Sequence, residues 1–254
     1  GQPKLAEGYH RRALAIREQA FGPEHPDVAA SLNNLGNVAA ELGQLDEAFA
    51  FHQRSLAIKE QVLGPDHPHI GTSLNNLGTI ATEQDELDVA LGYHRRALAI
   101  REQALGPDHP EVATSLHNLG DLHLRRGEFE LARSYFERAL ATHERALGSE
   151  HPALAHSLYG LGKTWLWLED PGRALIVLER ADRVWASSDD DVQRSAIRFE
   201  LARALWDVAP ERGRDRARAI ALAHTAHDAL ARDGRQRFGL IADIEAWMAA
   251  HRKR

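Results

Sequence analysis

Apolar and small residues recur along most of the chain at spacings of three and four. Within residues 106–147 they form two blocks, Val112, Ser115, Leu116, Leu119, Gly120 and His123, then Leu131, Tyr135, Phe136, Ala139 and Leu140. This spacing is the helical period, so the blocks predict two helices. Gly127 lies between them, where a helix commonly ends in a left-handed turn. The pattern predicts a helical hairpin.

The hairpin pattern repeats at a fixed interval. Gly22, Gly64, Gly106 and Gly148 stand 42 residues apart, and each opens a run like GPDHPEVATSLHNLG at 106–120. Self-similarity at such a period is typical of stacked repeats. Successive hairpins then rotate by similar amounts and form a curved stack with a concave face. We therefore expect an all-α solenoid.

The repeated turn has a local explanation. Gly106 ends one hairpin, and Pro107 prevents the helix from continuing. Asp108 or His109 can cap the next helix, with Pro110 in its first turn, where a missing N–H has no cost. The turn is expected to fix the angle between hairpins.

The repeat resembles the tetratricopeptide repeat, in the 42-residue form of kinesin light chains and of bacterial multidomain proteins, including serine/threonine kinases. The matching motif residues are Leu32, Leu35, Gly36 and Ala48; Leu74, Leu77, Gly78 and Ala90; Leu116, Leu119, Gly120 and Ala132; and Leu158, Leu161, Gly162 and Ala174. The resemblance implies a right-handed superhelix in which these glycines and alanines mark close helix contacts. A larger side chain there should overpack the interface.

The resemblance implies one solenoid over residues 1–254. We expect a trailing helix of a truncated repeat at 1–21, repeats at 22–63, 64–105, 106–147 and 148–187, a degenerate repeat at 188–233 and a capping helix at 234–254. The degenerate repeat has Leu201 and Ala202 at motif positions, with Ala219, Ala223 and Ala226 in its second helix. The capping helix should cover the stack with Leu240, Ile244, Trp247 and Met248.

Composition narrows the possible functions. The net charge of −6 is unevenly spread, with 13 Lys/Arg against 8 Asp/Glu in residues 194–254. No basic stripe is interleaved with aromatic residues, so nucleic acid is not an expected partner.

The chain lacks cysteine, which excludes thiolate chemistry and cysteine-based metal sites. Neither a signal peptide nor an apolar run of about 20 residues occurs, so we expect no membrane association and a cytoplasmic protein.

The histidines and serines do not indicate a cofactor or an enzyme. His25, His67, His109 and His151 are 42 residues apart, too far for one metal site, and should pack in the turns. His10, His52 and His94 share a position with Phe136, which favours packing. The segment GLGKT at 160–164 lacks the full spacing of a phosphate loop, and kinase motifs are absent. We predict no metal, no cofactor and no catalytic residue.

The candidate binding residues lie on the face of each first helix that lines the concave groove in the tetratricopeptide family. They are Asn34, Asn37, Glu41, Asn76, Thr79, Glu83, Asn118, Asp121, Arg125, Lys163 and Trp167. The resemblance implies that the asparagine ladder Asn34, Asn76 and Asn118 hydrogen-bonds the backbone of an extended peptide, and Gly160 breaks the ladder. The alternative is that these asparagines are remnants of duplication that bond water or each other.

Several features refine this site. Its charge runs from acidic at Glu41, Glu83 and Asp121 to basic at Arg125, Lys163 and Arg203, which suits a ligand that binds in one direction. Asn33, Asn75 and His117 replace the basic residues that grip a terminal carboxylate in one subclass of the family. Trp167 is the candidate aromatic anchor, whereas Trp165 is expected to be buried.

We therefore predict a non-catalytic module that binds a peptide or a partner domain of unknown identity. Two alternatives remain open. The truncated first helix could expose Leu5, Tyr9 and Ala13, and the solenoid could self-associate end to end. The chain could also be a regulatory segment of a larger, kinase-like protein.

Overall fold

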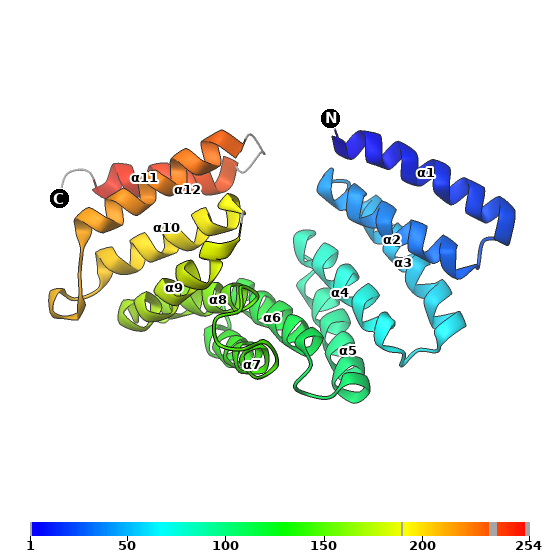
Figure 1. Ribbon diagram of the computed structural model, residues 1–254, viewed down its shortest axis with the longest axis horizontal. Helices are drawn as coiled ribbons and strands as arrows, with labels where there is room; N and C mark the ends of the chain where they lie inside the picture. Colours follow the sequence, from blue (N-terminus) through cyan, green and yellow to red (C-terminus); the bar gives the residue numbers. More distant parts are fainter. Residues whose placement is uncertain (1, 189, 234–237, 252–254) are drawn as a thin grey trace. The chain divides into compact units, whose positions relative to one another are not determined.

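The computed structural model consists of helices joined by short turns (Figure 1). It describes residues 2–188, 190–233 and 238–251, and no strand occurs in these ranges. The chain divides into two compact units, Gly1–Arg126 and Gly127–Arg254, each of which is described separately. The all-α prediction is confirmed.

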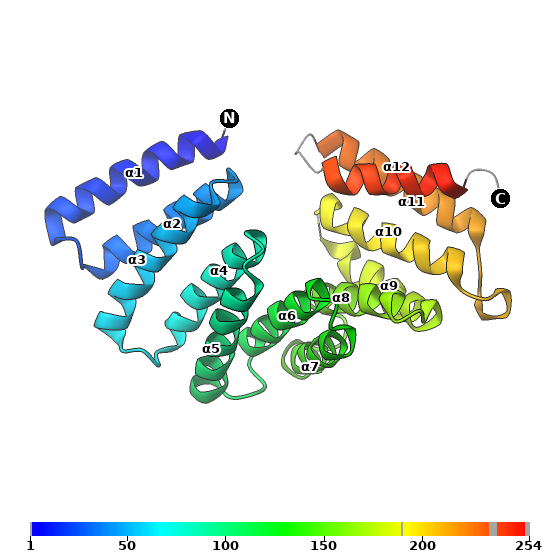
Figure 2. The same ribbon diagram turned by 180° about the vertical axis from the view of Figure 1, so that it is seen from behind.

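Unit 1 is a series of antiparallel helices. They are α1 (Gln2–Phe21), α2 (Pro26–Glu41), α3 (Leu45–Leu63), α4 (Pro68–Glu83), α5 (Leu87–Leu105) and α6 (Pro110–Arg125). α2 pairs with α3 and α4 with α5 as hairpins, and the first helix of each following hairpin packs on the second helix of the one before. Figure 2 shows the same pairs from behind. Helix pairs pack as in a tetratricopeptide-type solenoid, as predicted.

Unit 2 continues the pattern with less regular elements. They are α7 (Phe129–Leu147), α8 (Leu154–Trp167), α9 (Pro171–Val184), the 3₁₀ turns Trp185–Ser187 and Pro210–Arg212, α10 (Asp191–Asp207), α11 (Arg216–Asp233) and α12 (Phe238–His251). α12 packs against α11 and buries Ile244 and Met248. Residues 234–237 and 252–254 of the predicted capping segment lie outside the described residues.

Histidine, rather than the preceding acidic residue, caps the first helices of unit 1. His25, His67 and His109 adopt extended backbone angles, and each Nδ1 accepts the N–H two residues later at 3.2 Å. Pro follows each histidine at the first helical position. The side chain satisfies an N–H that the helix itself cannot pair. These histidines therefore position the hairpins.

The turn inside each hairpin needs a left-handed residue. Gly43 and Gly127 have φ of 74° and 73°, as predicted, and Asp85 and Glu169 occupy the corresponding positions with φ of 63° and 58°. A side chain at positive φ costs roughly 1–2 kcal/mol because its Cβ approaches the following carbonyl oxygen. Two of the four turns thus carry local strain.

The motif glycines lie where two helices nearly touch. A Cβ added to Gly36 would lie 2.6 Å from the His52 ring, and one added to Gly78 would lie 2.6 Å from the His94 ring. His52 and His94 are buried, which confirms their predicted packing role. Leu131, which belongs to the apolar pattern of 106–147, is instead 51% exposed. Its equivalent Val89 is also exposed, since this position faces outward in both helices.

A second set of contacts between hairpins was not predicted. The Arg17 guanidinium donates to Ser31 Oγ, Lys59 Nζ donates to Ser73 Oγ at 2.8 Å, and Arg101 Nη1 donates to Ser115 Oγ at 2.9 Å. The serines are fully buried and stand 14 residues after their partners. We call these contacts cation–serine pairs. A cation from each second helix thereby ties it to the next first helix.

Candidate functional site

Most predicted binding residues lie on the first helices of unit 1. Asn34, Asn37, Glu41, Thr79, Glu83 and Arg125 are exposed, whereas Asn76, Asn118 and Asp121 are half-buried. We call this row of side chains on α2, α4 and α6 the first-helix stripe. Its members are accessible to a partner, while neighbours such as Leu35 and Leu77 form the core.

Helices α4, α5 and α6 line a cavity of about 110 Å³ beside the stripe. It is lined by Thr79, Thr82, Glu83, His94, His117, Asn118, Asp121 and Arg125. Five of these were predicted from the sequence; Thr82, His94 and His117 were not. Glu83 and Arg125 are exposed at the surface, whereas Thr82 and His94 are buried. The structure thus brings the central part of the stripe together, while Asn34, Asn37, Glu41 and Asn76 lie apart from this cavity.

The two threonines present oxygen lone pairs to the cavity. Thr79 Oγ1 donates to the Asn75 carbonyl at 3.0 Å, and Thr82 Oγ1 donates to the Gly78 carbonyl at 2.8 Å. A hydroxyl has one proton and two acceptor lone pairs. Because both protons are used within α4, the hydroxyls can only accept further hydrogen bonds.

His94 is held by a buried polar network. Asn75 Nδ2 donates to Ser115 Oγ at 3.0 Å, which leaves Asn75 Oδ1 to accept from His94 Nδ1 at 3.1 Å. Burial lowers the pKa of His94 to about 4; the nearby Arg101 cation acts in the same direction, while Asp121 opposes it. His94 is therefore neutral at pH 7, with its proton on Nδ1 and a lone pair on Nε2.

The charged residues at the cavity are only partly neutralised. Arg125 Nε donates to Asp121 Oδ2 at 3.3 Å, one helical turn away on α6, with both side chains about half exposed. Exposed pairs of this kind contribute little to stability. The predicted acidic-to-basic gradient therefore contains an internal pair at this point.

The asparagine ladder is partly engaged within the protein. Asn76 Nδ2 donates to Asn33 Oδ1 at 3.2 Å across neighbouring hairpins. Within the residues that the structure describes, the side chains of Asn34 and Asn118 make no hydrogen bond. Asn76 thus bonds a residue outside the ladder, and Asn34 and Asn118 keep their amide groups available.

Phe136 explains why the ladder ends. In unit 2, a Cβ on Gly160 would lie 2.4 Å from the Phe136 ring, which is fully buried. An asparagine at 160 would collide with this ring. Phe136 stands where His94 stands one repeat earlier, and this larger ring leaves room only for glycine at the ladder position 160.

The remaining predicted residues belong to unit 2. Trp167 is 59% exposed and stacks on Phe129 with 5.4 Å between ring centroids, whereas Trp165 is buried as predicted. Lys163 Nζ lies 5.4 Å from the centre of the Tyr159 ring. Trp167 is thus an accessible aromatic surface with a fixed orientation.

Unit 2 also holds a buried carboxylate close to these residues. Glu200 accepts from Arg203 Nη1 at 2.8 Å. Burial raises the pKa of Glu200, although the Arg203 and Lys163 cations oppose the change. The predicted basic residue Arg203 is therefore paired rather than available as a lone cation.

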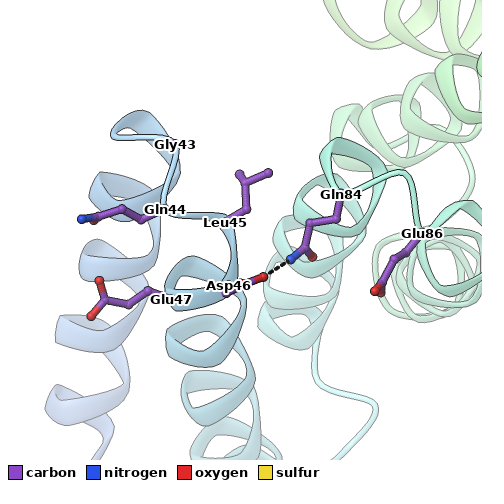
Figure 3. Close-up of a pocket in the computed structure, with 7 residues that line it drawn as sticks. All are labelled: Gly43, Gln44, Leu45, Asp46, Glu47, Gln84 and Glu86. Atoms are coloured by element: carbon purple, nitrogen blue, oxygen red, sulfur yellow. Dashed lines mark hydrogen bonds between the residues drawn. The ribbon is translucent and has the colours of Figure 1, made fainter.

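A wider depression lies at the loops that join the helices of two successive hairpins (Figure 3). It measures about 670 Å³ and is lined by Gly43, Gln44, Leu45, Asp46, Glu47, Gln84 and Glu86. Gln84 Nε2 donates to Asp46 Oδ1 across it at 2.7 Å. All seven residues are exposed or half-buried, so it provides no enclosed site.

Comparison with known proteins establishes the family. The family described as tetratricopeptide repeat matches residues 1–61, 27–103, 70–144 and 122–187. The chain belongs to the tetratricopeptide repeat family. This repeat is a general protein-interaction module, and no catalytic family is indicated. No curated protein sequence matches the chain.

Solved structures share the tetratricopeptide fold at low sequence identity. BtubC (BKLC) from P. vanneervenii is 18% identical over 92% of this chain and 93% of its own, with a TM-score of 0.72. A kinesin-light-chain-like protein of Podosopora anserina with nearly identical TPR-like repeats is 24% identical over 84% of this chain and 99% of its own, with a TM-score of 0.62.

A Rap protein complexed with Competence and Sporulation Factor is also similar to this tetratricopeptide chain. It is 16% identical over 98% of this chain and 70% of its own, with a TM-score of 0.68.

In the described part of this chain, no helix combines the length and apolar character needed to cross a membrane.

Proposed function

We propose that this tetratricopeptide chain is a non-catalytic interaction module that binds an extended peptide along the first-helix stripe. The observation that carries the proposal is the cavity beside Asn118, where predicted stripe residues from α4 and α6 gather around buried polar groups. The free amides of Asn34 and Asn118 support it, because an amide both donates to and accepts from a peptide backbone. The Rap protein, of similar fold, forms a complex with Competence and Sporulation Factor.

The test is a screen of displayed random peptides against the chain and a triple variant with Asn34, Asn76 and Asn118 changed to Ala. We expect peptides that bind the original chain and bind the variant at least tenfold more weakly, since several backbone hydrogen bonds are lost. Circular dichroism and thermal melting must be unchanged in the variant. Peptides that bind both proteins equally well would place the binding surface elsewhere.

A second candidate function is self-association through α1. Tyr9 and Ile16 lie on this helix and are 65% and 57% exposed. At the position of Ile16, Ile58 and Ile100 are buried against the first helices of their own hairpins. At the position of Tyr9, Phe51 and Tyr93 are half-buried. If this face joins two copies, light scattering will show a mass that rises with concentration, and Tyr9→Glu will abolish the rise. A constant monomer mass would exclude this role.

A further inference from the structure

The cavity between α4, α5 and α6 is lined mainly by hydrogen-bond acceptors. The hydroxyls of Thr79 and Thr82 donate within α4 and present lone pairs outward. Glu83 and Asp121 add carboxylates at its rim. The lining therefore favours a ligand group that is rich in donors.

His94 provides a hydrogen-bond acceptor at the cavity that no described residue uses. The side chain is 2% exposed and lines the cavity. Its Nδ1 proton is used by Asn75, and Nε2 receives no hydrogen bond from any residue that the structure describes. A donor that enters the cavity would satisfy it.

The charges at the cavity also favour a cation. Asp121 is shared with Arg125, whose side chain is 51% exposed, so the guanidinium remains at the rim. Glu83 forms no ion pair with any described residue. An incoming cation would meet the Glu83 carboxylate and compete with Arg125 for Asp121.

We propose that this cavity receives a primary ammonium group, such as the end of a lysine side chain of the bound partner. The inference rests on the proposed function, because it names a side chain that the bound peptide brings. An ammonium has three donors and no acceptor, which matches a lining of acceptors from three helices. A volume of about 110 Å³ is several times the roughly 10–15 Å³ that a cavity needs to hold one water. A carboxylate would instead be repelled by Glu83 and Asp121.

The probe is n-butylammonium, titrated into the ¹⁵N-labelled full chain at low salt. The readout is the imidazole ¹⁵N resonance of His94, assigned by its loss in His94→Gln. We expect a saturable shift of Nε2 as its lone pair accepts a proton donor. 1-Butanol and butyrate should produce no saturable shift, and n-butylguanidinium should bind more weakly than n-butylammonium.

Charge variants sharpen the test. Glu83→Gln and Asp121→Asn should each raise the dissociation constant of n-butylammonium by about tenfold, the effect expected for loss of a charge-assisted hydrogen bond. Arg125→Gln should lower it, because a competing cation is removed. Glu41→Gln is the matched control, since Glu41 lies 42 residues before Glu83 on the same stripe and does not line the cavity. It should have no effect.

The outcomes separate this inference from the proposed function. A missing shift, an equal response to 1-butanol, or insensitivity to Glu83→Gln and Asp121→Asn would overturn the ammonium site. Tighter binding of n-butylguanidinium would overturn the choice of ammonium. Selected peptides that depend on the ladder but carry neither lysine nor a free N-terminal amine would uphold the proposed function and refute this inference. A saturable ammonium response without any selected peptide would uphold the ammonium site and refute the proposed function.

Discussion

The contact between Gly78 and His94 makes a quantitative prediction about the wall of the candidate site. In Gly78→Ala the new Cβ would lie 2.6 Å from the His94 ring. The ring cannot move freely, because Asn75 holds its Nδ1. Overpacking of this kind costs about 1–3 kcal/mol, while alanine gains about 1 kcal/mol over glycine in a helix. We expect Gly78→Ala to be neutral or to destabilise the fold by up to about 2 kcal/mol.

Gly92 on α5 is the matched control. It is exposed, and nothing lies within 4 Å of a Cβ added there. Gly92→Ala should therefore stabilise the fold by up to about 1 kcal/mol. Urea unfolding followed by circular dichroism measures both variants, and their difference isolates the overpacking cost. In a His94→Ala background this difference should largely vanish. Equal stabilisation by both alanines would refute the close contact.

Other predictions concern the buried polar groups and the turns. Burial lowers the pKa of His52 and His94 to about 4. Between pH 6.5 and 4 the unfolded chain therefore binds more protons than the folded chain. Urea unfolding should show that the free energy of unfolding falls by roughly 3 kcal/mol per histidine as pH falls through this window. A flat profile, or one that His52→Phe leaves unchanged, would contradict this. Arg101→Met should lower the free energy of unfolding by about 1–3 kcal/mol, because it removes the charge-assisted hydrogen bonds from the guanidinium to Ser115, Thr72 and Glu111. Arg95→Met, at an exposed position, should change the free energy of unfolding by less than about 0.5 kcal/mol. Glu169→Gly should raise the melting temperature, with a gain of about 0.5–1 kcal/mol, since glycine relieves the positive φ; a lower melting temperature would show that the turn is not strained.

The sequence allowed the hairpins and the first-helix stripe to be predicted, because both follow from periodic positions. The resemblance to the tetratricopeptide repeat implied that Gly78 marks a close helix contact, and helical spacing places Asn118 and Asp121 on one face. The sequence left two candidates for the helix cap, Asp108 and His109. Only the backbone angles and the hydrogen bond to His109 Nδ1 distinguish them.

The buried polar contacts were missed for a different reason. His94 was assigned to packing, and its part in the cavity depends on Asn75 and Ser115, which reach it from two other helices. The cation–serine pairs did leave a signal: Arg17, Lys59 and Arg101 each precede a serine by 14 residues. Helical periodicity did not reveal it, since a serine at a small-residue position is equally consistent with packing.

Chemical-shift mapping with a peptide from the random library tests the proposed function most directly. In the ¹⁵N-labelled chain, the side-chain amides of Asn34, Asn76 and Asn118 give their own resonances. The proposed function predicts that the peptide shifts these resonances together with backbone amides of α2, α4 and α6. Shifts confined to the exposed face of α1 or to the loops around Gly43, with the asparagine amides unchanged, would contradict it.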